Sequence, residues 1–283
     1  MVRRPRQRPR PAVASAGPRP APRDAAVTAP LTRALTPVGR LFSLAADVVV
    51  SAFKPPFQLR EYIEQTWFVT KVSALPTALF TIPFGATIAL LLGELTRQFG
   101  AQSQTGAGSV LAIVQQAAPI VTALLISGAG GSAVCADLGA RTIREEIAAM
   151  EVLGISPIQR LVVPRVLAMA TTALVLNGLA TVVGVAGGYF FNVIVQGGTP
   201  GAYIAAFSSI AQVSDILVSE LKAVLFGFTA GIVAAYRGLN PPPGPKGVGD
   251  AVNQSVVISF VLVFFLNLVL TTLYLDLVPP KGS

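Results

Sequence analysis

Five long apolar stretches alternate with shorter polar segments along most of the chain. A helix needs about 20 mostly apolar residues to cross the hydrocarbon core of a bilayer. The fourth stretch must begin before Lys222, because the 14 residues between Lys222 and Arg237 would reach only about 21 Å as a helix. The pattern predicts an all-α polytopic membrane protein with spans at about 69–95, 109–133, 161–195, 215–236 and 251–275.

The segment that precedes the first span, residues 36–66, has an amphipathic pattern. Its apolar residues at helical spacing fall on one face: Leu41, Leu44, Val48 and Ala52. A Lys-Pro-Pro sequence then interrupts the helix. This pattern is typical of a helix that lies in the membrane interface without crossing it. Trp67, the only tryptophan, stands at the expected boundary and is interpreted as an interfacial anchor.

Charged and apolar positions are mixed between the second and third spans, in residues 141–153. The spacing predicts a short amphipathic helix with Ile143, Ile147, Met150 and Gly154 along its apolar stripe. Gly154 ends this helix and Pro157 keeps it from resuming. The pattern alone leaves two interpretations equal: the stripe rests on the ends of the neighbouring spans, or it docks a partner protein.

Composition supports the membrane class and narrows the chemistry. The chain is 53% hydrophobic and 12% charged, against about 25% charged residues in an average soluble domain. It has no histidine and a single cysteine, which excludes an internal disulfide and the usual histidine-based zinc and triad chemistries. We therefore expect no catalytic residues, no metal site and no cofactor.

The net charge of +8 is concentrated in residues 1–40, which hold nine arginines and one acidic residue. Residues 1–35 are rich in proline, arginine and alanine, and are predicted to be a disordered basic tail. Such a tail could bind nucleic acid through phosphates, but an arm facing anionic lipids on the cytoplasmic side is the favoured interpretation.

Basic residues are distributed unequally between the two sets of loops. Seventeen Lys and Arg residues fall in segments 1–60, 141–165 and 237–250, whereas the opposite loops hold only Arg97 and Lys281. Because basic loops stay in the cytoplasm, the distribution predicts a plasma-membrane protein with a cytoplasmic N-terminus and an external C-terminus. Residues 67–278 would form its transmembrane domain.

Residues 128–165 resemble a signature region of a known family. The run "ADLGARTIREEI", followed by "MEVLG" and "LVVPR", is similar to the MlaE/YrbE permeases of lipid-transporting ABC systems. The chain looks most like the A-type YrbE subunit of an actinobacterial Mce transporter. "PFQLREYIEQTWF", "SALPTALFTIPFG" and "GVGDAVNQSVV" fit as well, and the resemblance covers roughly residues 40–278.

The resemblance implies a permease subunit that forms a lipid path and imports lipids such as fatty acids or sterols. A separate ABC ATPase would drive it through residues 141–153 as a coupling helix. A second YrbE-type permease would complete a heterodimer, with a homodimer as the alternative, and a ring of MCE-domain proteins would stand on the outer face. Ala148 departs from a usually acidic position. The implied coupling residues are Arg141, Arg144, Glu145, Glu146, Ile147, Met150, Glu151, Leu153, Gly154 and Pro157.

Other features bear on the alternatives. The chain has no phosphate-binding loop that ends in Gly-Lys-Ser/Thr, so we do not expect it to be an ATPase itself. Charges within spans are functional candidates, and Glu94, Glu220 and Lys222 could contact a lipid headgroup. The simpler interpretation is that Lys222 extends to the outer interface. A secondary transporter or channel, and a non-transporting scaffold of an envelope complex, remain the alternative functions.

Overall fold

The computed structural model describes residues 24–100, 105–201, 203–205 and 213–277. The chain divides into two units, Met1–Arg40 and Leu41–Ser283. The first unit contributes the beginning of helix α1 (Asp24–Ala52). Residues 1–23 of the predicted disordered tail lie outside the described part. From Asp24 the structure differs from that prediction, since the chain is helical there and its alanines and leucines favour a helix.

Five helical runs are long and apolar enough to cross a membrane, and they confirm the predicted all-α polytopic fold. The described residues form no β-strand. Each run continues past the predicted span into polar residues, because a helix does not end where the hydrocarbon ends. The runs are Leu59–Gln98, Gly108–Ile143, Ile158–Val195, Val213–Leu239 and Gly244–Tyr274.

In the second and third of these runs, α-helices alternate with wide turns of π-helix, which are labelled η. The first run is α2 (Leu59–Gln98). The second comprises α3 (Thr105–Ala112), η2 (Ile113–Ala117), α4 (Ala118–Leu125), η3 (Ile126–Gly130) and α5 (Gly131–Ile143). The short α6 (Glu146–Val152) follows. The last three runs comprise η4 (Ile158–Val162), α7 (Val163–Phe190), η5 (Phe191–Val195), α9 (Val213–Leu239) and α10 (Gly244–Leu277).

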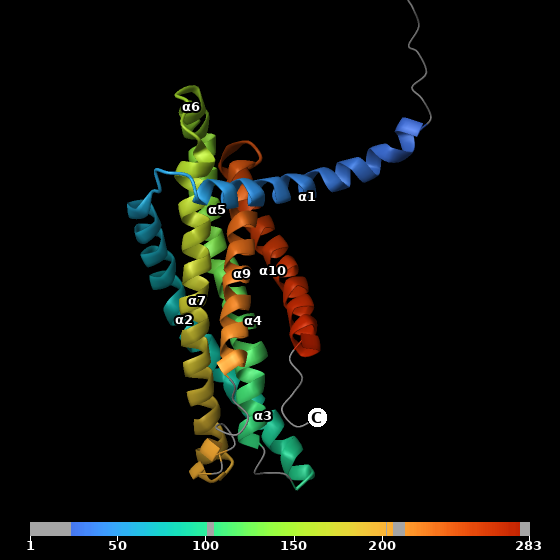
Figure 1. Cartoon of the computed structure of the whole chain (residues 1–283), viewed down its shortest axis with the longest axis vertical. Coiled ribbons are helices and arrows are strands. Elements are labelled where there is room, and N and C mark those ends of the chain that lie inside the picture. The colour runs from blue at the N-terminus through green and yellow to red at the C-terminus, as the bar shows by residue number, and fades with distance from the viewer. Residues whose placement is uncertain (1–23, 101–104, 202, 206–212, 278–283) are drawn as a thin grey trace, which may run out of the picture. The chain divides into compact units, whose positions relative to one another are not determined.

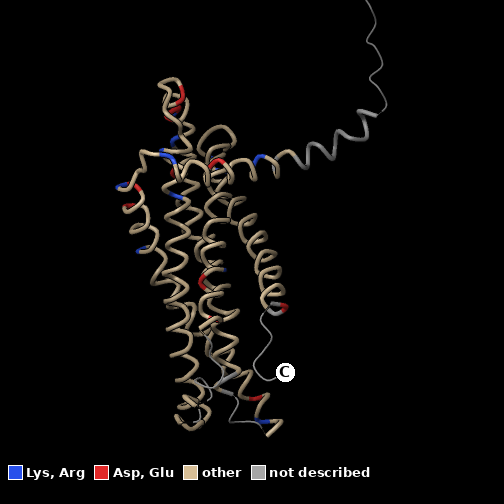
Figure 2. The backbone as a smooth tube through the Cα atoms, viewed as in Figure 1, with Lys and Arg blue, Asp and Glu red and all other residues tan. Residues whose placement is uncertain are grey.

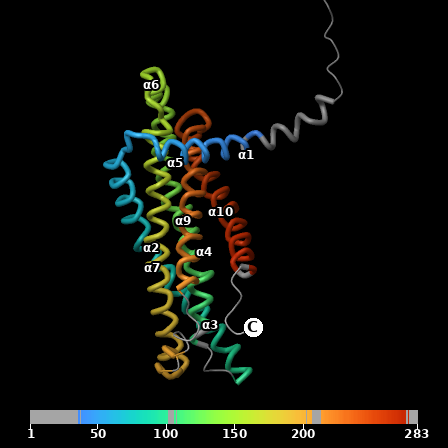
Figure 3. Tube along the Cα trace, in the orientation of Figure 1, coloured from blue at the N-terminus to red at the C-terminus, as the bar shows by residue number. Residues whose placement is uncertain are grey.

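Helix α7 lies in the middle of the second unit, with α2 on one side and α9 on the other, and α9 also packs against α5 and α10 (Figures 1 and 3). A glycine, Gly227, lets α9 approach α7 closely. A Cβ added to Gly227 of α9 would lie 2.6 Å from the backbone oxygen of Met169 in α7. Small residues commonly allow such contact between membrane helices, because the backbones then approach closely.

The part of α1 in the second unit confirms the predicted apolar face. Leu44 and Val48 are buried in the main hydrophobic core, and Leu41 and Ala52 pack partly against it. The opposite face exposes apolar side chains, and Phe53 just after the helix is 86% exposed. A helix that is buried on one face and apolar on the other is compatible with the predicted place in the membrane interface.

Helix α2 begins at Leu59, so residues 59–66 form the first turns of the first long helix. The sequence analysis assigned them to the interfacial segment. The chain is broken only between Ala52 and Leu59, where two prolines follow Lys54. No further break separates Leu59 from the apolar residues of the span, and the helix therefore runs through.

Charged residues are unevenly placed along the helices of the second unit. Figure 2 shows them gathered at the end of the helices next to α6, where α5 ends and α7 begins, with long uncharged stretches beyond. We call this end the α6 end. Its arrangement decides what the predicted coupling segment can do.

Candidate functional site

The predicted helix over residues 141–153 is divided into two pieces. Helix α5 ends at Ile143, and Glu145 has φ 60°, a left-handed conformation that is uncommon for a residue with a side chain. Helix α6 then occupies Glu146–Val152. Gly154, with φ 74°, ends it, and the amide of Ile155 donates to the oxygen of Met150 at 2.9 Å. The helix therefore stops at the predicted glycine but starts later than predicted.

Helix α6 has an inner and an outer apolar surface. Ile147 and Met150, from the predicted stripe, are partly buried and pack against the main core. Ile143, predicted on the same stripe, ends α5 instead and is 39% exposed. The outer surface lies at the C-terminal end of α6, where Val152 is 88%, Leu153 73% and Ile155 37% exposed. We call these three residues the α6 tip. The inner stripe thus holds α6 to its own chain, and the tip is left for another contact.

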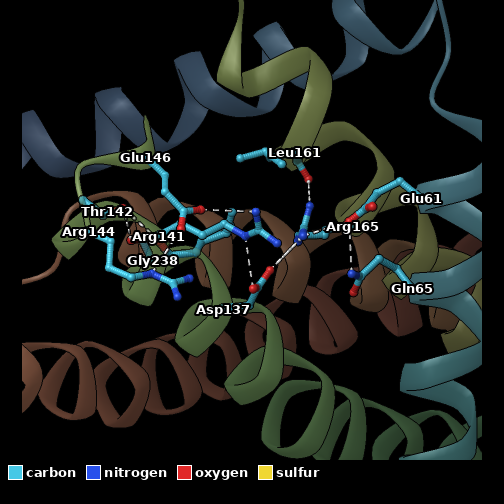
Figure 4. A network of polar contacts seen from close by, with 11 residues as sticks. Glu61, Gln65, Asp137, Arg141, Thr142, Arg144, Glu146, Leu161, Arg165 and Gly238 are labelled. Carbon is cyan, nitrogen blue, oxygen red and sulfur yellow. Dashed lines mark hydrogen bonds and ion pairs between the residues drawn. The ribbon is translucent and has the colours of Figure 1, made fainter. Parts of the chain in front are cut away.

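Behind α6 lies a buried arginine, Arg165, in the first turn of α7 (Figure 4). It is only 1% exposed. Its Nη2 lies 2.8 Å from Oδ2 of Asp137 in α5 and 2.9 Å from Oε1 of Glu61 in α2. Its Nε donates to the same Asp137 oxygen at 3.1 Å, and its Nη1 donates to the oxygen of Leu161 at 2.8 Å. One guanidinium thus joins α2, α5 and α7.

Asp137 extends this network toward α6. Its other oxygen, Oδ1, accepts from Nε of Arg141 at 3.2 Å. Nη1 of Arg141 lies 3.4 Å from Glu146, and Nε of Arg144 lies 3.1 Å from the same carboxylate. With Arg165 and Glu61, the network holds three arginines and three carboxylates, so its charges balance. Figure 4 shows how these six side chains lie next to one another in space, from α2 to the start of α6.

The predicted coupling residues have different positions around this network. Arg141, Arg144 and Glu146 belong to it. Glu145 forms the left-handed link, and Glu151 and Leu153 are exposed. Pro157 directly precedes the wide turn η4.

Sequence reasoning missed Glu61, Asp137 and Arg165. A signal existed, because Asp137 ends a long uncharged stretch and Arg165 begins another. Charges at the edge of such stretches are often functional.

The three charges predicted within spans do not form one site. Glu94 is exposed, and among the described residues no hydrogen bond or ion pair joins it to Glu220 or Lys222. Lys222 is 2% exposed and does not extend to the surface. Its Nζ donates to Oγ1 of Thr271 at 2.9 Å and to the oxygen of Gln115 at 3.3 Å.

Further polar side chains continue from Lys222. Nε2 of Gln115 donates to Oδ1 of Asp215 at 3.0 Å, and Tyr274 donates to the same oxygen. Glu220 is half-buried, and its Oε2 has no hydrogen-bond partner within the described ranges. The membrane-spanning part therefore contains a polar cluster between η2, α9 and α10, which the sequence pattern did not group together.

Comparisons with known proteins agree with this architecture. Residues 62–273 match the family Permease MlaE. A probable ABC transporter permease protein of Rickettsia felis is 31% identical over 234 residues, which are 83% of this chain and 90% of the relative. One from Synechocystis is 30% identical, covering 82% and 88%. The intermembrane phospholipid transport system permease protein MlaE of Haemophilus influenzae is 27% identical, covering 76% and 85%. The chain therefore belongs to the MlaE permease family.

Proposed function

We propose that this chain is the membrane subunit of an ABC-type lipid transporter, driven by a separate ATPase that docks on α6. This proposal is supported above all by the exposure of the apolar side chains of the α6 tip. Val152 and Leu153 are the most exposed apolar residues of a charged segment, and no described part of the chain covers them. Exposed apolar residues rimmed by charges are typical of a protein interface. The family membership and the name of the Haemophilus relative support a lipid as the transported molecule.

The coupling would use both surfaces of α6. The tip would sit in a groove of the ATPase, and nucleotide-driven closure of the ATPase would shift it. The inner stripe of Ile147 and Met150 presses on the core shared by α5, α7 and α9, so a shift of α6 would move the ends of these helices. Packed helices respond by discrete repacking, because close-packed cores are not continuously deformable. Alternating access would follow from that repacking.

The orientation proposed from the positive-inside rule places the α6 end in the cytoplasm, where ATP is available. The positions of the network's three arginines support this proposal, because Arg141, Arg144 and Arg165 all lie in the segment 141–165, whose basic residues the rule assigns to the cytoplasm. The C-terminus would then be external.

The resemblance to YrbE subunits supports an Mce-type complex. A second permease subunit would pair with this one, as a heterodimer in preference to a homodimer, and MCE-domain proteins would stand on the outer face. The imported lipid would be a fatty acid, a sterol or a related molecule. Helix α10 exposes a broad apolar surface that includes Phe260, Phe264 and Phe265, which suits lipid or a second subunit.

Lys222 is the best candidate for contact with a lipid headgroup. Its described partners are a hydroxyl and a carbonyl oxygen, and no carboxylate within the described part lies at ion-pair distance. An anionic headgroup would supply the missing charge if α9 and α10 separate during transport. Glu94 and Glu220 remain weaker candidates, because neither lies with Lys222 in one polar cluster.

Reconstitution separates this function from its alternatives. The chain would be placed in liposomes with its second permease subunit, and movement of fluorescent fatty acid would be followed with and without the ATPase and ATP. An ABC permease requires both. A secondary transporter or channel would move lipid without the ATPase, and a scaffold would move none under any condition. Mass spectrometry of the lipids retained by the purified complex would identify the cargo.

A further inference from the structure

Arg165 is the most completely enclosed charge in the described part of the chain. All three nitrogens of its guanidinium contact oxygen atoms, and those oxygens come from Glu61, Asp137 and Leu161. The contacts reach two other helices, α2 and α5. Since an arginine fork can hold two carboxylates in fixed directions, it fixes the relative position of the helices that carry them.

The break between α5 and α6 makes this arginine important for transmission. Glu145 interrupts the backbone helix with a left-handed residue, so α6 is not a rigid continuation of α5. A side-chain link crosses the break, because Arg141 of α5 holds Glu146 at the start of α6. Arg141 also holds one oxygen of Asp137, whose other oxygen belongs to Arg165. A displacement of α6 therefore has a continuous ionic route to α7 and α2.

Stability alone is a poor explanation for such a group. Replacing a buried ion pair by apolar side chains of similar volume is often neutral or stabilising, because burying charge carries a desolvation penalty. The neighbouring positions are apolar and buried, since Leu161 and Val162 precede Arg165 and Leu138 follows Asp137. A methionine or leucine at position 165 could fill the space, but it could not hold two carboxylates on two helices.

We propose that Arg165 is a positioning residue for energy coupling. Together with Asp137 and Glu61 it makes the α6 ends of α2, α5 and α7 move as one body when the ATPase displaces α6. This inference rests on the proposed function. It adds that the ionic joint, and not only the apolar packing of Ile147 and Met150, transmits the movement.

The test compares lipid moved per ATP hydrolysed in proteoliposomes that contain the full complex. Asp137→Asn removes one charge with little change of shape, and Arg165→Gln removes the guanidinium group while keeping a polar side chain. We expect each variant to bind the ATPase and to hydrolyse ATP, while lipid moved per ATP falls about tenfold, within the usual range of coupling between sites. Arg165→Lys keeps the charge without the fork and should recover only part of the ratio. Arg60→Gln is the matched control, since Arg60 is exposed and its ion pair within the described residues is with Glu64 on its own helix.

The outcomes separate this inference from the proposed function. If the wild-type complex moves no lipid with ATP, the proposed function itself fails. If the wild type works and Arg165→Gln keeps the native ratio, or loses ATPase binding while folded, the joint is not the transmitting element. If Arg165→Gln does not fold, Glu61→Gln decides, because it removes one partly exposed carboxylate and leaves the arginine paired with Asp137. A native ratio in folded Glu61→Gln would overturn the inference, and a severalfold loss would support it.

Discussion

The most informative substitution is the double change Val152→Ala and Leu153→Ala at the α6 tip. Both side chains point away from the chain's own core, since they are 88% and 73% exposed. Their removal should leave folding unchanged and weaken only the contact with the ATPase.

The size of the effect follows from the area that a partner would cover. The two changes delete about five carbon groups, each worth about 0.8 kcal/mol when buried. Scaled by the exposed fractions of the two residues, the loss of binding free energy is about 3 kcal/mol, which corresponds to a Kd at least about 100-fold weaker.

The measurement is titration of the purified ATPase onto the permease complex in nanodiscs, read by biolayer interferometry. Val182→Ala with Leu174→Ala on α7 is the matched control, because it deletes the same groups from exposed positions within a span. The control should bind the ATPase with native affinity. A change of less than about threefold for the α6 variant, with an unchanged melting temperature, would show that the tip is not the docking surface.

Three further predictions concern the spans and the loop after α7. Gly227→Ala should lower the free energy of unfolding by about 1–3 kcal/mol, because the added Cβ would lie 2.6 Å from the backbone oxygen of Met169. The control Gly249→Ala should not destabilise the protein, because its Cβ would meet no atom within 4 Å. Thermal unfolding in detergent compares the two variants, and equal melting temperatures would contradict the packing of α9 on α7. Lys222→Met should reduce lipid transport about tenfold and leave ATPase binding unchanged. Lys71→Met, at an exposed lysine of α2, is the control. A native transport rate in Lys222→Met would exclude a headgroup role for Lys222. Burial raises the pKa of Tyr203 to about 12, above its unfolded value near 10, so the wild type should lose stability as the pH rises from about 10 toward 12. Denaturant unfolding at pH 9 and pH 11 should show a smaller loss of stability for Tyr203→Phe. Equal losses in the two proteins would show that Tyr203 is not the group responsible.

The spans were predictable because hydropathy depends only on local composition. The five apolar runs can be recognised in the sequence however the helices pack. The inner face of α1 was predictable for a similar reason. Leu44 and Val48 are four residues apart, so a helix places them on one face whatever covers it.

The ionic network was not predictable from local pattern. Asp137 and Arg165 are 28 positions apart, and their contact depends on how α5 and α7 pack. The split of the predicted helix at residues 141–153 has a different origin. A single left-handed residue, Glu145, divides it, and no glycine marks the position in the sequence. As a result Arg141 pairs with Glu146 across the break.

Lys222 shows how packing overrides a sound general rule. Lysines near the end of a membrane helix usually extend to the interface. Here the hydroxyl of Thr271 on α10 and the backbone oxygen of Gln115 in η2 hold its ammonium group inside the protein. These partners are 49 and 107 positions away, so only the folded chain brings them to the lysine.

Coupling to an ATPase requires that α6 face the compartment that contains ATP. Glu151 lies on α6 and is exposed, and the only native cysteine, Cys135, is fully buried, so Glu151→Cys can be labelled with little background. A membrane-impermeant maleimide should label this variant in inverted membrane vesicles and leave it unlabelled in intact cells. Labelling in intact cells, with none in inverted vesicles, would place α6 outside and contradict coupling to a cytoplasmic ATPase.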